Sequence, residues 1–336
     1  MGAGGSVEAL CKAITSNDQV RVQQGLNDVT IRKTVNLNQL AYRGMAPVHC
    51  AAKVGNPVVL RHLLSFPRVD PNLPDQIEYT ALHHAAGTVL PPRCSQAVAD
   101  LMYHKADPCV QSADGSTALD VARARGCAHC VRTLEDKVKL WQGWVDHYEH
   151  KLMFIPKFTA KWLVVLLDRR PNSGRGVGAT ALCHRCGASQ PVKRRCWQFK
   201  CISCPQELMV LPTVQLALYE PRHATSTMIL PDTAKPSNTM AVPLQGVTAE
   251  VVGPASWGTA KAALMEGKLK KVLQNAVGSS REHGLRIRFY RSGEQVDLLL
   301  RVARDEDRTE LINVMTNLGP HVAAFDPMSA RPRAPP

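Results

Sequence analysis

The sequence has no long apolar run. The longest, residues 163–167, spans five residues, whereas a helix that crosses a bilayer needs about 20. We therefore expect no transmembrane segment. The start also shows no signal peptide, because Glu8 interrupts it and no basic segment precedes an apolar stretch. We expect a cytoplasmic chain whose eleven cysteines are core residues or metal ligands rather than disulfides.

Recognisable catalytic motifs are lacking as well. No nucleophile is accompanied by a base motif, and no glycine-rich loop is suited to cradle phosphate. The strongest metal motif, described below, supplies four protein ligands and so leaves no open position for catalysis. The sequence therefore predicts a protein that is not an enzyme.

Acidic residues are scarce in the middle of the chain. The whole sequence carries a net charge of +13, and residues 137–223 hold 14 basic against 5 acidic side chains, a net charge of +9. Residues 1–136 are almost neutral, with 13 against 12. A basic region beside a neutral one indicates an anionic target, either a phospholipid surface or nucleic acid.

An internal repeat occupies the neutral part. Residues 46–56, 79–87 and 115–126 align on one another, with 34 residues from His49 to His83. The Ala-Pro-Val-His and Thr-Ala-Leu-His segments resemble ankyrin repeats, whose period is about 33 residues. The resemblance implies an all-α solenoid of about four repeats over residues 7–136. Such a solenoid offers a concave surface to a protein partner.

Two features of the repeats resemble catalytic or metal motifs. His49 and His83 each begin a repeat helix, so we interpret them as hydrogen-bonding residues of the helix start. Cys127 and Cys130 form a Cys-x-x-Cys pair at the start of the last helix. No second such pair is near them in the repeats, so we expect core residues there and no metal.

After Leu140 the pattern changes to about seven strands and a closing helix, whose apolar residues Leu311, Val314, Met315 and Leu318 share one face. Gly143-Trp144 and Lys161-Trp162 fit the first two strands of a pleckstrin-homology domain, which residues 140–318 resemble. Leu311 replaces the tryptophan usual in that family's closing helix. The resemblance implies a β-barrel capped by a C-terminal helix, making the protein multidomain. The composition of residues 319–336 is typical of a disordered tail.

The same resemblance implies a binding site for phosphoinositide headgroups beside the first two strands. The basic residues that would form it are Lys151, Lys157, Lys161, Arg169 and Arg170. Lysine offers a point charge rather than a bidentate fork, so we expect general attraction to anionic lipid. The alternative is a solvated basic loop on a domain that binds protein.

Two Cys-x-x-Cys pairs interrupt the second part of the chain at residues 181–208. They are Cys183 with Cys186 and Cys201 with Cys204, separated by fourteen residues. Four thiolates at this spacing predict a structural Zn²⁺ in an inserted zinc ribbon.

The predicted zinc ribbon leaves two alternative functions for the protein. Basic and aromatic residues between the pairs, Lys193 to Arg195 with Trp197, leave nucleic-acid binding open. Arf GTPase-activating proteins combine similar modules, but their finger has a sixteen-residue spacing and an arginine where Met209 stands. The charge that develops in phosphoryl transfer would lack that stabiliser, which disfavours this alternative.

Residues 1–6 form a flexible lead-in that carries a lipidation pattern. Met1-Gly2 followed by Ser6 fits the signal for N-myristoylation of Gly2. One myristoyl chain anchors weakly unless a basic patch adds to it. The sequence therefore predicts an adaptor that holds a protein partner on its ankyrin repeats while its basic module lies at a membrane surface.

Overall fold

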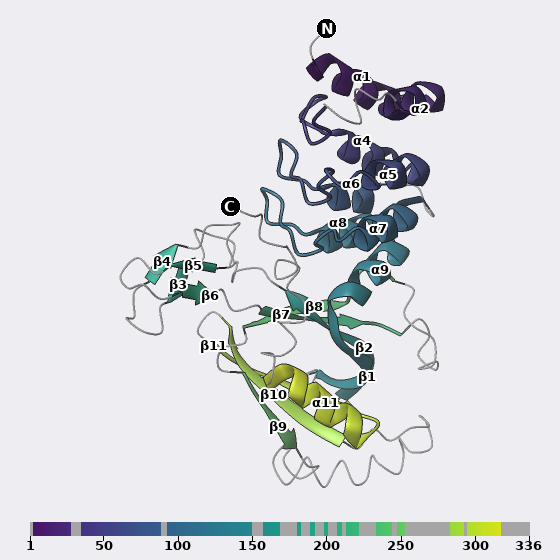
Figure 1. Cartoon of the computed structure of the whole chain (residues 1–336). Coiled ribbons are helices and arrows are strands. Elements are labelled where there is room, and N and C mark those ends of the chain that lie inside the picture. The colour runs from purple at the N-terminus through teal and green to yellow at the C-terminus, as the bar shows by residue number, and fades with distance from the viewer. Residues whose placement is uncertain are drawn as a thin grey trace. The chain divides into compact units, whose positions relative to one another are not determined.

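The computed structural model describes residues 3–27, 35–88, 93–149, 157–168, 180–182, 189–191, 198–200, 207–209, 213–221, 233–243, 247–252, 283–291 and 294–316. The chain divides into two compact units (Figure 1). The first comprises Met1–Val138 with Thr233–Lys235 and Pro327–Pro336. The second comprises Lys139–Asp232 and Pro236–Asp326.

The described helices of the first unit form four pairs that follow one another along a column (Figure 1). Helices α1, α4, α6 and α8 pack in one row, and α5, α7 and α9 pack in a second row. The bounds are α1 Ala3–Thr15, α2 Gln19–Asn27, α4 Pro47–Val54, α5 Pro57–Leu64, α6 Ala81–Gly87, α7 Arg93–Tyr103, α8 Ala118–Arg125 and α9 Ala128–Val138.

Local sequence determines where these helices begin and end. Gly55 ends α4 with φ of 71°, a left-handed conformation that favours glycine. The next residue, Asn56, caps α5, where its side chain accepts hydrogen bonds from the N–H groups of Val58 and Val59. Gly126 ends α8 in the same left-handed conformation as Gly55. These capping residues keep the helices short, so the chain folds back on itself once per repeat.

Small side chains allow the inner row of helices to approach closely. Ala51 and Ala52 of α4 and Ala85 and Ala86 of α6 are all fully buried. Larger side chains at these positions would overfill a closely packed interior. The alanine pairs seen in the sequence thus lie where the repeats stack.

The second unit is built on a seven-stranded antiparallel sheet in the order β8-β7-β2-β1-β11-β10-β9. Two runs of neighbouring strands meet where β1 pairs with β11. The strands are β1 Lys139–Glu149, β2 Lys157–Asp168, β7 Thr213–Tyr219, β8 Asn238–Pro243, β9 Thr248–Val252, β10 His283–Arg291 and β11 Glu294–Val302.

This sheet is not closed into a barrel, so the expected barrel is corrected to an open sheet. Its edge strands, β8 and β9, are short and share no ladder in the described part of the chain. Helix α11 (Asp305–Thr316) instead covers the apolar face, adding Leu311, Val314 and Met315 to a core that includes Trp141 and Phe289. A helix therefore completes the core that strand pairing leaves open.

Two small hairpins complete the described strands. Strands β3 (Thr180–Leu182) and β4 (Ser189–Pro191) pair with each other, as do β5 (Gln198–Lys200) and β6 (Glu207–Met209). Within the ranges given above, no helix has both the length and the apolar character needed to cross a membrane.

Candidate functional site

A groove of about 710 Å³ lies in the first unit between the inner helices and the turns that precede them. Helices α4, α6 and α8 contribute to it, together with the turns around Ile77 and Asp114. Its lining residues are Lys53, Val54, Ile77, Tyr79, His83, His84, Gly87, Thr88, Asp114, Ser116, Asp120, Val121, Ala124 and Arg125. Repeat proteins bind their partners on surfaces to which successive repeats contribute in this way.

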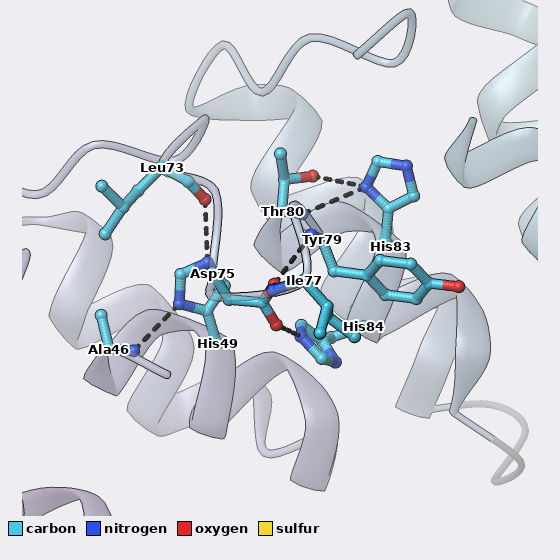
Figure 2. A network of polar contacts seen from close by, with 9 residues as sticks. All are labelled: Ala46, His49, Leu73, Asp75, Ile77, Tyr79, Thr80, His83 and His84. Carbon is cyan, nitrogen blue, oxygen red and sulfur yellow. Dashed lines mark hydrogen bonds and ion pairs between the residues drawn. The ribbon is translucent and has the colours of Figure 1, made fainter. Parts of the chain in front are cut away.

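His49 and His83 fix the helix starts beside this groove, as the sequence predicted (Figure 2). The Nδ1 of His49 accepts the N–H of Ala46 at 3.0 Å, so its Nε2 carries the proton and donates to the carbonyl of Leu73 at 2.8 Å. His83 repeats the arrangement. Its Nδ1 accepts a hydrogen bond from the N–H of Thr80, and its Nε2 donates one to the carbonyl of Ser116 in the next repeat. Both imidazoles are structural.

Asp75 organises the turn that leads to the groove (Figure 2). Its Oδ1 accepts hydrogen bonds from the N–H groups of Ile77 and Tyr79, at 3.0 and 2.8 Å. Its Oδ2 lies 2.8 Å from the Nε2 of His84. One buried carboxylate thus holds a tight turn on helix α6, and Ile77 stands on that turn.

Burial keeps the three imidazoles near the groove neutral. It lowers the pKa of His49 from 6.5 to about 4, although the hydrogen bond to Leu73 opposes the shift. Burial also lowers the pKa values of His83 and His84, and for His84 it outweighs the neighbouring carboxylate of Asp75. At neutral pH these groups therefore add hydrogen bonds to the site but no charge.

The accessible surface of the groove combines apolar and basic side chains. Ile77 is 58% exposed, and Tyr79 is half-buried beside it. Lys53 and Arg125 are exposed cations of the lining. The exposed carboxylate of Asp114 accepts hydrogen bonds from the serine donors of its own turn, which lower its pKa and keep it negatively charged. The groove therefore offers an apolar contact with charges of both signs around it.

Most of the predicted lipid and zinc residues lie outside the described residues. These are Gly2, Lys151, Arg169, Arg170, Cys183, Cys186, Cys201 and Cys204. Lys157 begins β2, opposite Glu149 of β1. Lys161 is only 5% exposed, and its ammonium is paired with the carboxylate of Glu220. These two are the predicted lipid-binding residues that the structure describes, so that assignment stays a prediction.

Sequence reasoning did not find a group of three cysteines. Cys130, predicted as a core residue, and Cys127 are joined by Cys94 from the preceding repeat. Their sulfur atoms all lie within 4.8 Å of one another. The available signal was the 33-residue separation of Cys94 and Cys127, which is one repeat period and places both at the same level of adjacent repeats.

Helix pairs, a histidine at two helix starts and stacked alanines are the features of a repeat solenoid, and a family comparison agrees. Residues 43–76 match the ankyrin repeat. This range contains His49 and Asp75 and ends one residue before Ile77, so the matched repeat supplies the carboxylate of the turn and part of the groove. An ankyrin repeat implies an interaction with another protein.

Three relatives resemble parts of the chain. XBOS34 of Oryza sativa subsp. japonica is 37% identical over 101 residues, which cover 29% of this chain and 19% of the relative. XBAT34 of Arabidopsis thaliana is 30% identical over 167 residues, which cover 47% of this chain and 39% of the relative. XBAT35 of the same plant is 28% identical over 169 residues, which cover 48% of this chain and 32% of the relative. The chain thus spans well under half the length of these relatives.

The names of these relatives overturn one expectation. All three are named E3 ubiquitin-protein ligases, which contradicts the prediction that the chain is not an enzyme. That prediction rested on missing nucleophile and phosphate motifs. Such motifs identify a chain that carries out chemistry with its own side chains, whereas group transfer is also accelerated by holding two reactants together. The absence of nucleophile and phosphate-binding motifs is therefore not sufficient to exclude an enzyme.

Proposed function

We propose that the groove holds a protein segment for a reaction of ubiquitin ligation. The observation that carries the proposal is Ile77, an exposed apolar side chain on a turn that Asp75 fixes at the groove. A rigid turn loses little conformational entropy when it binds. The names of the relatives supply the reaction, and the matched ankyrin repeat supports a protein as the bound molecule.

The charges around the groove are of both signs. Lys53 and Arg125 are exposed cations, and Asp114 and Asp120 are carboxylates of the same lining. We infer a segment that places an apolar side chain on Ile77 and charged side chains beside it. Apolar anchors give such interfaces most of their affinity, and rim charges mainly guide and accelerate association.

The proposal is tested by a charge placed on the apolar contact. Ile77→Asp puts a carboxylate where the segment buries its anchor. Val58→Asp is the matched control, because Val58 is 66% exposed on α5 and does not line the groove. We expect proteins whose ubiquitin modification depends on the full chain to lose it with Ile77→Asp and to keep it with Val58→Asp. Equal modification with wild type and Ile77→Asp would contradict the proposal.

For the second unit we propose a pleckstrin-homology-like fold with an inserted zinc ribbon. Support comes from two runs of neighbouring strands joined through β1 and β11, followed directly by α11. The chain between β3 and β4 contains Cys183 and Cys186, and the chain between β5 and β6 contains Cys201 and Cys204. Each pair therefore lies between the strands of a hairpin, a position suited to a zinc knuckle.

Association of this unit with anionic lipid, with Gly2 as a lipid attachment point, is proposed from the charge of residues 137–223. Lys161 is engaged by Glu220, so the attraction would rest on the other basic residues. Sedimentation of the full chain with phosphoinositide vesicles tests it. Lys157→Ala should reduce binding at low salt, and vesicles that recover no protein would exclude the lipid role.

A further inference from the structure

Three thiols meet at the junction between the last two repeats. The Sγ of Cys127 lies 3.3 Å from that of Cys94 and 3.0 Å from that of Cys130. Cys94 and Cys130 are fully buried, whereas Cys127 is half-buried. The group therefore has two buried members and one, Cys127, that is partly exposed.

Helix starts surround this group. Cys94 lies in the first turn of α7, and Cys130 lies in the first turn of α9. Cys127 precedes α9, where its carbonyl accepts the N–H of Val131. The Sγ of Cys127 also lies 3.5 Å from the backbone nitrogen of Cys130. The positive end of the α9 dipole, together with this N–H, favours negative charge on the sulfur of Cys127.

The sulfur distances fit a metal ion after a small adjustment. Thiolates bind tetrahedral zinc at about 2.3 Å, which places pairs of sulfur atoms about 3.8 Å apart. The three sulfur atoms here already lie within 4.8 Å of one another, and the pairs at 3.3 and 3.0 Å need to open by about 0.5 and about 0.8 Å. A change of this size lies within ordinary side-chain movement.

We propose that Cys94, Cys127 and Cys130 bind a thiophilic metal ion of the zinc class. Three thiolates select soft ions over magnesium or calcium. They leave the fourth position of a tetrahedral ion to water or to an external ligand on the exposed side of Cys127. The bound ion would tie the start of α9 to the start of α7. It would therefore join the last two repeats through a site separate from the groove and from the four cysteines of the predicted zinc ribbon.

Zinc content of the full chain, purified with reductant, tests the proposal. Cys127→Ser is the first variant, because its side chain is half-buried and the change is tolerated more easily than at the two buried positions. We expect it to contain about one zinc equivalent less per chain than wild type. Cys109→Ser is the matched control, since Cys109 is another buried cysteine of the same unit outside the group, and it should keep the full content.

Two further measurements distinguish this site from the predicted zinc ribbon and from a disulfide. The zinc that Cys183→Ala removes should be lost in addition to that lost with Cys127→Ser, because the two sites are independent. Added zinc should raise the melting temperature of metal-depleted wild type by more than that of metal-depleted Cys127→Ser. Equal zinc content in wild type and Cys127→Ser would overturn the proposal. So would an intact mass lower by about 2 Da, which shows a disulfide in the reduced preparation.

Discussion

The imidazole of His84 lies 2.8 Å from one oxygen of the Asp75 carboxylate, and the other oxygen accepts hydrogen bonds from the turn at Ile77 and Tyr79. A single buried side chain thus connects helix α6 to the turn that presents the apolar contact of the groove. The shape of the groove and the stability of the repeat therefore depend on the same group.

Replacing Asp75 by asparagine separates these two roles. Asp75→Asn keeps an oxygen for the N–H groups of the turn, but its amide cannot accept the proton of His84 Nε2. Hydrogen bonds to charged groups contribute about 1.5–3 kcal/mol. We therefore expect the free energy of unfolding of the first unit to fall by about 2 kcal/mol in urea titrations.

The control for this change is an exposed carboxylate. Glu8 forms a surface ion pair with Lys12, and such pairs contribute about 1 kcal/mol or less. Glu8→Gln should therefore leave the unfolding midpoint close to that of wild type. If Asp75→Asn matched Glu8→Gln, the carboxylate would not hold the turn.

Acid should destabilise the first unit through its buried histidines. The folded-state pKa values of His49, His83 and His84 lie below 6.5, so the unfolded chain binds more protons once the pH falls below that value. Stability is then lost as the pH decreases toward the folded-state values. For His49, with a pKa of about 4, the loss approaches about 3 kcal/mol.

Urea midpoints measured from about pH 7 to about pH 4.5 test this dependence. His49→Gln keeps an acceptor for Ala46 and a donor for Leu73 without a titratable group, so its profile should be less steep than that of wild type. Parallel profiles of the two proteins would show that His49 does not carry the effect.

A methyl group at Gly143 should destabilise the second unit. A Cβ at this position would lie 2.7 Å from the ring of Trp141, and Trp141 is buried in the core of the sheet. Overpacking of this kind costs about 1–3 kcal/mol. Tryptophan fluorescence during denaturation should show an earlier transition for Gly143→Ala than for Gln142→Ala, which alters the exposed neighbouring residue. Coincident transitions would contradict the close packing.

Features that depend on neighbouring residues were predictable from the sequence. The repeat helices, the hydrogen-bonding roles of His49 and His83, and the apolar face of Leu311, Val314 and Met315 all follow from periodicity and capping over a few residues. The structure confirms each of them. Such patterns are local, because the interactions that enforce them lie within one or two helical turns.

Features that depend on distant partners were not predictable in the same way. Closure of the sheet depends on whether its edge strands pair, and β8 and β9 do not share a ladder in the described residues. Lys161 is one of the predicted lipid-binding residues, and its ammonium forms an ion pair with Glu220, 59 residues later. Cys94 was likewise overlooked, because a thiol one repeat away is adjacent only after the helices have stacked.

The histidine hydrogen bonds also give the array a direction. His49 donates to Leu73 and His83 donates to Ser116, so each of these repeats completes a carbonyl of its successor. At the corresponding position of the last matching segment stands Asp120, whose carboxylate accepts from both the N–H and the hydroxyl of Thr117. A carboxylate offers no proton to a following carbonyl. The series of histidine donors therefore stops at Asp120, and a consensus repeat added after α9 would find no such donor unless Asp120 were replaced by histidine.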